Sequence, residues 1–126
     1  MAIHTELNLR LPNSPGALAN VCRLLGDERV NVLAMALESG GQLRLLVDNH
    51  THGAAVLREH HHQVVEREVI VTSVPNAAGA LAPALRLVAT AGVNIEYAYS
   101  GAVTHQTALV VLGVDDAMRA ASAAGV

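Results

Sequence analysis

The sequence contains no lysine, phenylalanine or tryptophan, and it has one cysteine. Without lysine the chain has no side-chain amine for a Schiff base or an internal aldimine, which excludes the enzymes that depend on either. The single thiol, Cys22, cannot form a disulfide within the chain, and its place in an apolar helical stripe predicts a buried, unreactive group. Because Tyr97 and Tyr99 are the only aromatic residues, the core has to be built from aliphatic side chains.

Charge and hydropathy exclude two further classes of partner. The net charge is −3 and the basic residues are eight scattered arginines, so the basic patch and aromatic platform of a nucleic-acid-binding protein are missing. No apolar run approaches the roughly 20 residues of a membrane span, and the polar start IHTELNLR is unlike a secretory leader. We therefore expect a cytoplasmic protein that binds neither nucleic acid nor membranes.

What the sequence does contain is a duplication. The stretch PNSPGALAN at 12–20 matches PNAAGALAP at 75–83 when the chain is shifted by 63 positions, and the match continues without a gap to Asn31 and Asn94. A register shared over a turn, a helix and the next strand indicates an internal repeat. Units of this size bury little surface alone. We therefore predict two domains, a first copy at 1–63 and a second copy at 64–126, that pack on each other.

Apolar periodicity predicts the same order of elements in both copies. The expected elements of the first copy are strand 3–11, a helix capped by Asn13 or Ser14 with Pro15 in its first turn, strand 30–37, a turn at 39–41, strand 43–47 and helix 51–61. Those of the second copy are strand 64–74, helix 79–91, strand 93–100, a turn near Gly101, strand 106–114 and a helix from Asp115. This order is a split βαβ unit of ferredoxin-like kind, so the fold class is α+β.

One strand is expected to serve both copies. Residues 64–74 contain no turn signal, and under the shift Val126 corresponds to Gln63, so the second copy would have no closing strand of its own. The shared strand would pair with residues 3–11 in one six-stranded antiparallel sheet, with the helices on one face and the second strand of each copy at an outer edge. The exposed face and edges of such a sheet favour a homodimer.

Three motifs carry a resemblance to a known family. The turn P-N-x-P-G-A-L-A before a helix, V-N-V at the start of the second strand and L-R-L-L-V-D before the second helix resemble the ACT domain, a small regulatory module that binds amino acids. Over nearly all its length the chain resembles the stand-alone bacterial proteins made of two tandem ACT domains. Ala78 departs from the family pattern, because a proline is expected there.

The resemblance implies a free amino acid as ligand, bound at an interface between modules by the first turn and by the asparagine that opens the second strand. The residues implied in the first copy are Asn13, Ser14, Gly16, Ala17, Leu18 and Asn31. The residues implied in the second copy are Asn76, Ala77, Gly79, Ala80, Leu81 and Asn94.

Physical chemistry is compatible with such a site but does not require it. A helix N-terminus offers unpaired N–H groups and a positive dipole end to a carboxylate, and an asparagine side chain can donate and accept. The same residues would also serve as an ordinary turn in a protein that binds nothing.

The leading hypothesis is a non-catalytic amino-acid sensor without a cofactor, acting on its own assembly or on a regulated enzyme that the sequence does not identify. The alternative is a metal-responsive protein that uses His50, His52 and the run 60–62, although a solvated helix end also accounts for that run. No nucleophile motif, phosphate loop or dinucleotide fingerprint supports an enzyme. Tyr97 and Tyr99 share a strand face and either line a pocket or fill the core.

Overall fold

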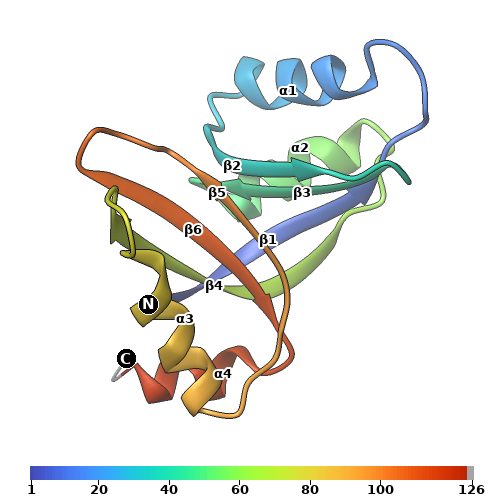
Figure 1. Cartoon of the computed structure of the whole chain (residues 1–126). Coiled ribbons are helices and arrows are strands. Elements are labelled where there is room, and N and C mark those ends of the chain that lie inside the picture. Colours follow the sequence, from blue (N-terminus) through green and yellow to red (C-terminus); the bar gives the residue numbers. More distant parts are fainter. Residues whose placement is uncertain (125–126) are drawn as a thin grey trace. The chain divides into compact units, whose positions relative to one another are not determined.

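The computed structural model describes residues 1–124 and contains six strands and four helices (Figure 1). The elements are β1 (Ala2–Arg10), α1 (Ala17–Asp27), β2 (Val32–Leu37), β3 (Gln42–Val47), α2 (His50–Glu59), β4 (Val65–Pro75), α3 (Leu81–Thr90), β5 (Ile95–Gly101), β6 (Thr107–Val114) and α4 (Ala117–Ala123). Across this part of the chain no helix is long and apolar enough to cross a membrane.

The strands form one antiparallel sheet in the order β2-β3-β1-β4-β6-β5. The α+β fold is therefore confirmed, with β4 between β1 and β6 and the second strand of each copy at an edge. Contacts divide the chain into two compact units. We call Thr5–Arg67 the N-terminal unit, and Met1–His4 together with the described residues from Glu68 onward the C-terminal unit.

The N-terminal unit has an aliphatic core on one face of its strands. Leu7 and Leu9 of β1 pair with Leu45 and Leu43 of β3, and these side chains are buried together with residues of α1 and α2. Val64, which precedes β4, is buried in the same cluster. The two helices therefore cover the side of β1 and β3 on which alternate leucines lie.

The C-terminal unit repeats this arrangement. Ile70 of β4 pairs with Leu112 of β6, and both are buried with Val88 of α3 and with alanines of α4. Met1 and Ile3, from the start of the chain, pack against this core. The beginning of β1 thus completes a core that is otherwise formed from the second copy.

The start of α1 corrects one sequence prediction. Neither Asn13 nor Ser14 caps the helix, because the N-cap is Gly16, with φ of 85° and no side-chain cap. The preceding turn closes when the Ala17 N–H donates to the Ser14 carbonyl over 3.3 Å, which leaves Pro15 outside the helix. Glycine is required at the cap because few side chains tolerate a positive φ.

The register between the two copies changes at the second hairpin. The Asn31 N–H donates to Asp48 Oδ1 and the Asn94 N–H donates to Asp115 Oδ1, both over 3.0 Å, although 67 positions separate the two aspartates. The β5–β6 hairpin is therefore four residues longer than the β2–β3 hairpin, and its turn at 102–106 is one residue longer than the turn at 38–41. The correspondence of Val126 with Gln63 assumed that the 63-residue register continues unbroken through this hairpin, and that assumption is wrong. Val126 itself lies outside the described residues.

Candidate functional site

The turn before α1 faces a hollow of about 400 Å³, a volume within the usual range of small-molecule sites. We call it the loop hollow. Five of the six residues implied in the first copy line it. The full lining is Leu11, Pro12, Asn13, Ser14, Gly16, Ala17, Leu18, Ala19, Leu37, Glu38, Ser39 and Gly41.

Hydrogen-bond donors lie on the helix side of the loop hollow. The first bond of α1 runs from the Asn20 N–H to the Gly16 carbonyl over 2.9 Å. The N–H groups of Leu18 and Ala19 have no acceptor within residues 1–124, as expected for the first turn of a helix. The Asn13 side chain is exposed and likewise has no partner in this part of the chain. This wall can therefore bind a carboxylate.

A carboxylate lies on the hairpin side. Glu38 lines the loop hollow, and its Oε1 accepts from Arg44 Nε over 3.1 Å. The hairpin is held close to the first turn because the Leu11 N–H donates to the Gly41 carbonyl over 2.8 Å. A Cβ at Gly41 would lie 2.5 Å from the Leu11 carbonyl oxygen, so glycine permits this approach. The loop hollow thus combines N–H donors with an anionic acceptor.

The structure does not bring Asn31 into the loop hollow. Asn31 precedes β2, its side chain is exposed, and its carbonyl accepts from the Asp48 N–H over 3.0 Å. Asn94 occupies the same position beside Asp115. Sequence reasoning assigned no role to the two aspartates, although each directly precedes a residue that caps the following helix.

The equivalent turn of the second copy is built differently. Asn76 Nδ2 donates to the Thr104 carbonyl over 2.8 Å, and its N–H donates to the Gln106 carbonyl over 2.9 Å. Gly79 has a positive φ of 78°, close to the 85° of Gly16. Ala77, Ala80 and Leu81 complete the start of α3, where Ala80 is the N-cap without a side-chain cap and Leu81 is exposed. The longer β5–β6 turn therefore accepts hydrogen bonds from Asn76, whereas Asn13, the equivalent residue of the first copy, is available to a ligand.

The histidines proposed as metal ligands make separate contacts. His50 Nδ1 lies 3.3 Å from Glu66 Oε1, His52 Nε2 lies 3.8 Å from Glu28 Oε1, and His60 Nδ1 lies 3.0 Å from the Val56 carbonyl. Within residues 1–124 no three His, Cys, Asp or Glu side chains are grouped so that they could hold a metal ion. The geometry therefore gives the metal hypothesis no support.

The two tyrosines do not line the loop hollow but pack within the C-terminal unit. Tyr97 lies directly over Gly113, where an added Cβ would be 2.1 Å from the ring. The Tyr97 and Tyr99 rings stack at 6.3 Å between centroids and 9° between planes. Both side chains are half-buried and neither belongs to the aliphatic core of the C-terminal unit. Their partners Gly113 and Val111 alternate with the core residues of β6, so the rings pack on the other face of the sheet, and the core-filling interpretation is not supported.

Comparisons with known proteins agree with this architecture. A family model described as the ACT domain pair matches residues 1–124, whereas no curated protein matches the chain in sequence. The solved structure of protein BT0572 from Bacteroides thetaiotaomicron is 29% identical, with a TM-score of 0.85 over 98% of this chain and 87% of that chain.

Two more distant structures share the fold. The ligand-free regulatory subunit of aspartate kinase from Thermus thermophilus is 20% identical, with a TM-score of 0.68 over 98% of this chain and 92% of that chain. E. coli aspartokinase III in complex with lysine and aspartate is 22% identical, with a TM-score of 0.58 over 94% of this chain and 30% of that chain. Because the family model spans all the described residues, this chain belongs to the ACT domain pair family.

Proposed function

We propose that the protein is a non-catalytic regulatory module that binds a free amino acid in the loop hollow. The observation that carries the proposal is the pairing of unbonded N–H groups at Leu18 and Ala19 with the Glu38 carboxylate on the facing hairpin. A zwitterion matches both walls, since its carboxylate suits the helix N-terminus and its ammonium group suits Glu38. Leu11, Leu37 and Leu18 add apolar surface for a side chain.

The first copy is the better candidate of the two. Its Asn13 side chain is available to a ligand, whereas the Asn76 amide donates to Thr104. A homodimer would give the exposed asparagines 31 and 94 a role, because each lies at the start of an edge strand, where a partner's ligand could reach it. The resemblance to ACT modules supports such shared sites. We also propose that the protein acts in the cytoplasm. Binding of the amino acid would there change the activity of an enzyme partner.

A thermal-shift screen of the twenty amino acids tests this function. A ligand that binds only the folded protein stabilises it by mass action, by about 2.7 kcal/mol when its free concentration is 100 times Kd. We expect one or more amino acids to raise Tm, and we expect Glu38→Gln, Asn13→Ala and Asn31→Ala to reduce that rise. Glu68→Gln is the matched control, because Glu68 is exposed, lies outside the loop hollow and loses the same charge.

The same screen with Zn²⁺, Ni²⁺ and Co²⁺ tests the metal hypothesis. A rise in Tm with a metal but with no amino acid would contradict the sensor. So would a complete absence of shifts in protein shown by mass spectrometry to carry no ligand.

A further inference from the structure

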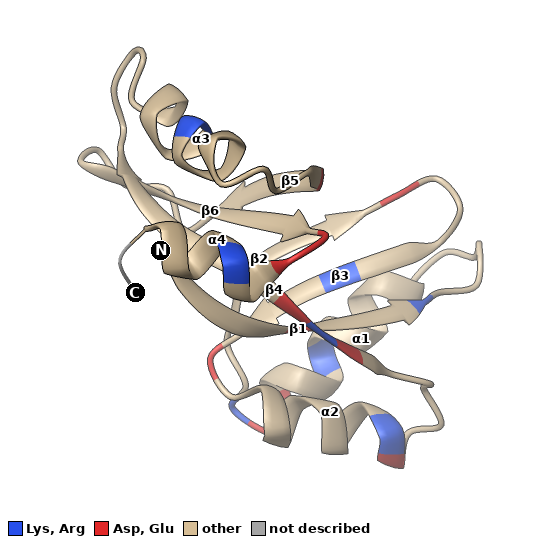
Figure 2. Cartoon of the chain, turned by 90° about the horizontal axis from the view of Figure 1, so that it is seen from below, with Lys and Arg blue, Asp and Glu red and all other residues tan. Residues whose placement is uncertain are grey.

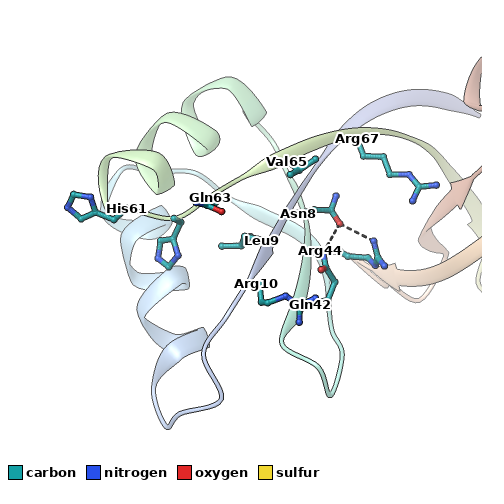
Figure 3. Close-up of a pocket in the computed structure, with 10 residues that line it drawn as sticks. Asn8, Leu9, Arg10, Gln42, Arg44, His61, Gln63, Val65 and Arg67 are labelled. Atoms are coloured by element: carbon teal, nitrogen blue, oxygen red, sulfur yellow. Dashed lines mark hydrogen bonds between the residues drawn. The ribbon is translucent and has the colours of Figure 1, made fainter.

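A second hollow in the N-terminal unit has a different chemistry. It measures about 630 Å³ and lies along β1, the β3 strand and the segment that leads from α2 into β4 (Figure 3). We call it the arginine hollow. Its lining is Asn8, Leu9, Arg10, Gln42, Arg44, His61, His62, Gln63, Val65 and Arg67. Because Asn8 and Arg10 alternate with the core leucines of β1, they point to the face opposite α1 and α2.

The arginine hollow concentrates positive charge on a chain whose net charge is −3. Three of the eight arginines line it and none of the eleven acidic residues does, although Glu38, from outside the lining, pairs with Arg44. Elsewhere the basic and acidic positions are spread over many elements, as Figure 2 shows in blue and red. A concave surface lined by charge of one sign attracts ions of the other sign.

The floor of the arginine hollow is held in a fixed geometry. Arg44 Nη1 donates to Asn8 Oδ1 over 2.9 Å, and Asn8 Nδ2 donates in turn to the buried Glu6 Oε1 over 2.8 Å. Gln42 Nε2 lies 3.3 Å from the same Asn8 oxygen, and Figure 3 shows both side chains directed at it. The Arg44 side chain is only 17% exposed. A guanidinium group held in this way loses little conformational entropy when it binds an anion.

Arg10 supplies donors at the rim. Its side chain is exposed, and its Nη1 donates to the Gly40 carbonyl, which leaves further N–H groups of the guanidinium available. His61 and His62 lie on the loop that follows α2, and Arg67 on β4 also lines the cavity while another residue engages it. Guanidinium groups match the geometry of phosphate and carboxylate oxygens.

We propose that the arginine hollow binds a small organic anion that carries phosphate or carboxylate groups. Its volume fits a metabolite, and no Phe, Tyr or Trp side chain lines it, so recognition is by charge and hydrogen bonding. The site is distinct from the loop hollow, because the two hollows share no lining residue.

Isothermal titration calorimetry with pyrophosphate and with citrate, at fixed ionic strength, tests the proposal. We expect saturable binding of one anion per chain for at least one probe. Stronger binding of pyrophosphate would identify a phosphate site, and stronger binding of citrate a carboxylate site. Arg10→Gln should weaken binding about tenfold by removing a charge-assisted donor. Arg86→Gln, which removes the same charge from an exposed position on α3, should leave binding unchanged.

A second measurement needs no variant. In the wild-type protein, titration with the same anions should shift the ¹⁵N-amide NMR signals of residues 8–10, 42–44 and 61–63. Shifts centred on residues 17–19 would place the anion at the helix start and overturn the proposal. It would also be overturned if neither probe binds at millimolar concentration, or if the two arginine variants weaken binding equally.

Discussion

At the scale of single residues, the two copies fill one position of the sheet in opposite ways. Ala34 of β2 pairs with Leu46 of β3, whereas at the equivalent place Tyr97 of β5 pairs with Gly113 of β6. The larger side chain is thus on the inner strand in the first copy and on the edge strand in the second. The Tyr97 ring leaves no room for a Cβ on its partner.

Gly113→Ala should therefore lower the free energy of unfolding by about 1–3 kcal/mol, the usual cost of overpacking. Gly26→Ala is the control, because Gly26 lies within α1 with no atom within 4 Å of an added Cβ. That substitution should stabilise the protein by about 0.4–1 kcal/mol. Urea denaturation measures both. If the clash is the cause, Tyr97→Ala should cost less in the Gly113→Ala protein than in the wild type; purely additive effects would contradict this explanation.

Asp48 and Asn31 separate a structural role from a functional one. The Asp48 carboxylate accepts from the backbone of Asn31, so Asp48→Ala should cost about 1 kcal/mol. Asn31→Ala keeps that backbone N–H and should change stability by less than about 0.5 kcal/mol. The pair Asp115 and Asn94 repeats the experiment in the other unit. A large loss of stability in either asparagine variant, measured by urea denaturation, would show that its side chain maintains the fold.

At the scale of helices and strands, the structure places side-chain caps at α2 and α4 but not at α1. Asn49 Oδ1 accepts from the His52 N–H over 3.1 Å, and Asp116 Oδ1 accepts from the Arg119 N–H over 3.0 Å. Asn49→Ala and Asp116→Ala should each lower stability by about 1 kcal/mol. Asn13→Ala and Ser14→Ala should not, because α1 is capped by Gly16. Urea midpoints of the four variants would show equal losses if the two turn residues did cap α1.

Periodicity was sufficient to predict the elements but not their ends. Alternating apolar residues located β1 and β3 to within a residue or two, because one face of each strand is buried. The start of α1 was predicted wrongly because the segment N-S-P-G offers several possible caps. Which of them is used depends on the Ala17 to Ser14 hydrogen bond and on the positive φ of Gly16. Neither can be read from residue types.

The candidate site was predictable only on its local side. The resemblance to ACT domains implied Asn13, Ser14, Gly16, Ala17 and Leu18 on the turn. The opposite wall comes from residues between Leu37 and Gly41, and that contact depends on the pairing of β1 with β3. The engagement of Asn76 was hidden for the same reason. It results from the longer β5–β6 hairpin, whose turn carbonyls at Thr104 and Gln106 accept from Asn76.

At the scale of the whole molecule, the compact units and the sequence repeats do not have the same limits. Val64 lies in the core of the N-terminal unit, while Met1 and Ile3 pack on the core of the C-terminal unit. We therefore expect that residues 1–63 and 64–126, expressed separately, do not fold cooperatively, and that mixing them restores a single unfolding transition. Circular dichroism during urea titration measures this. An isolated 64–126 fragment with the urea midpoint of the intact chain would contradict the expectation.

The hairpin between β2 and β3 is a wall shared by both hollows. Glu38 and Gly41 line the loop hollow, while Arg44 and Arg10 of the arginine hollow donate to Glu38 and to the Gly40 carbonyl. An anion that draws either guanidinium group away from the hairpin changes the electrostatic potential at Glu38, where an ammonium group would bind. By thermodynamic linkage, a ligand bound in one hollow changes the affinity of the other hollow for its own ligand. The second ligand changes the affinity for the first by the same factor. Because a displaced guanidinium group would leave more negative charge at Glu38 for an ammonium group, the coupling would be positive. A turn of four residues would then let one small chain respond to two metabolites present together rather than to either one alone.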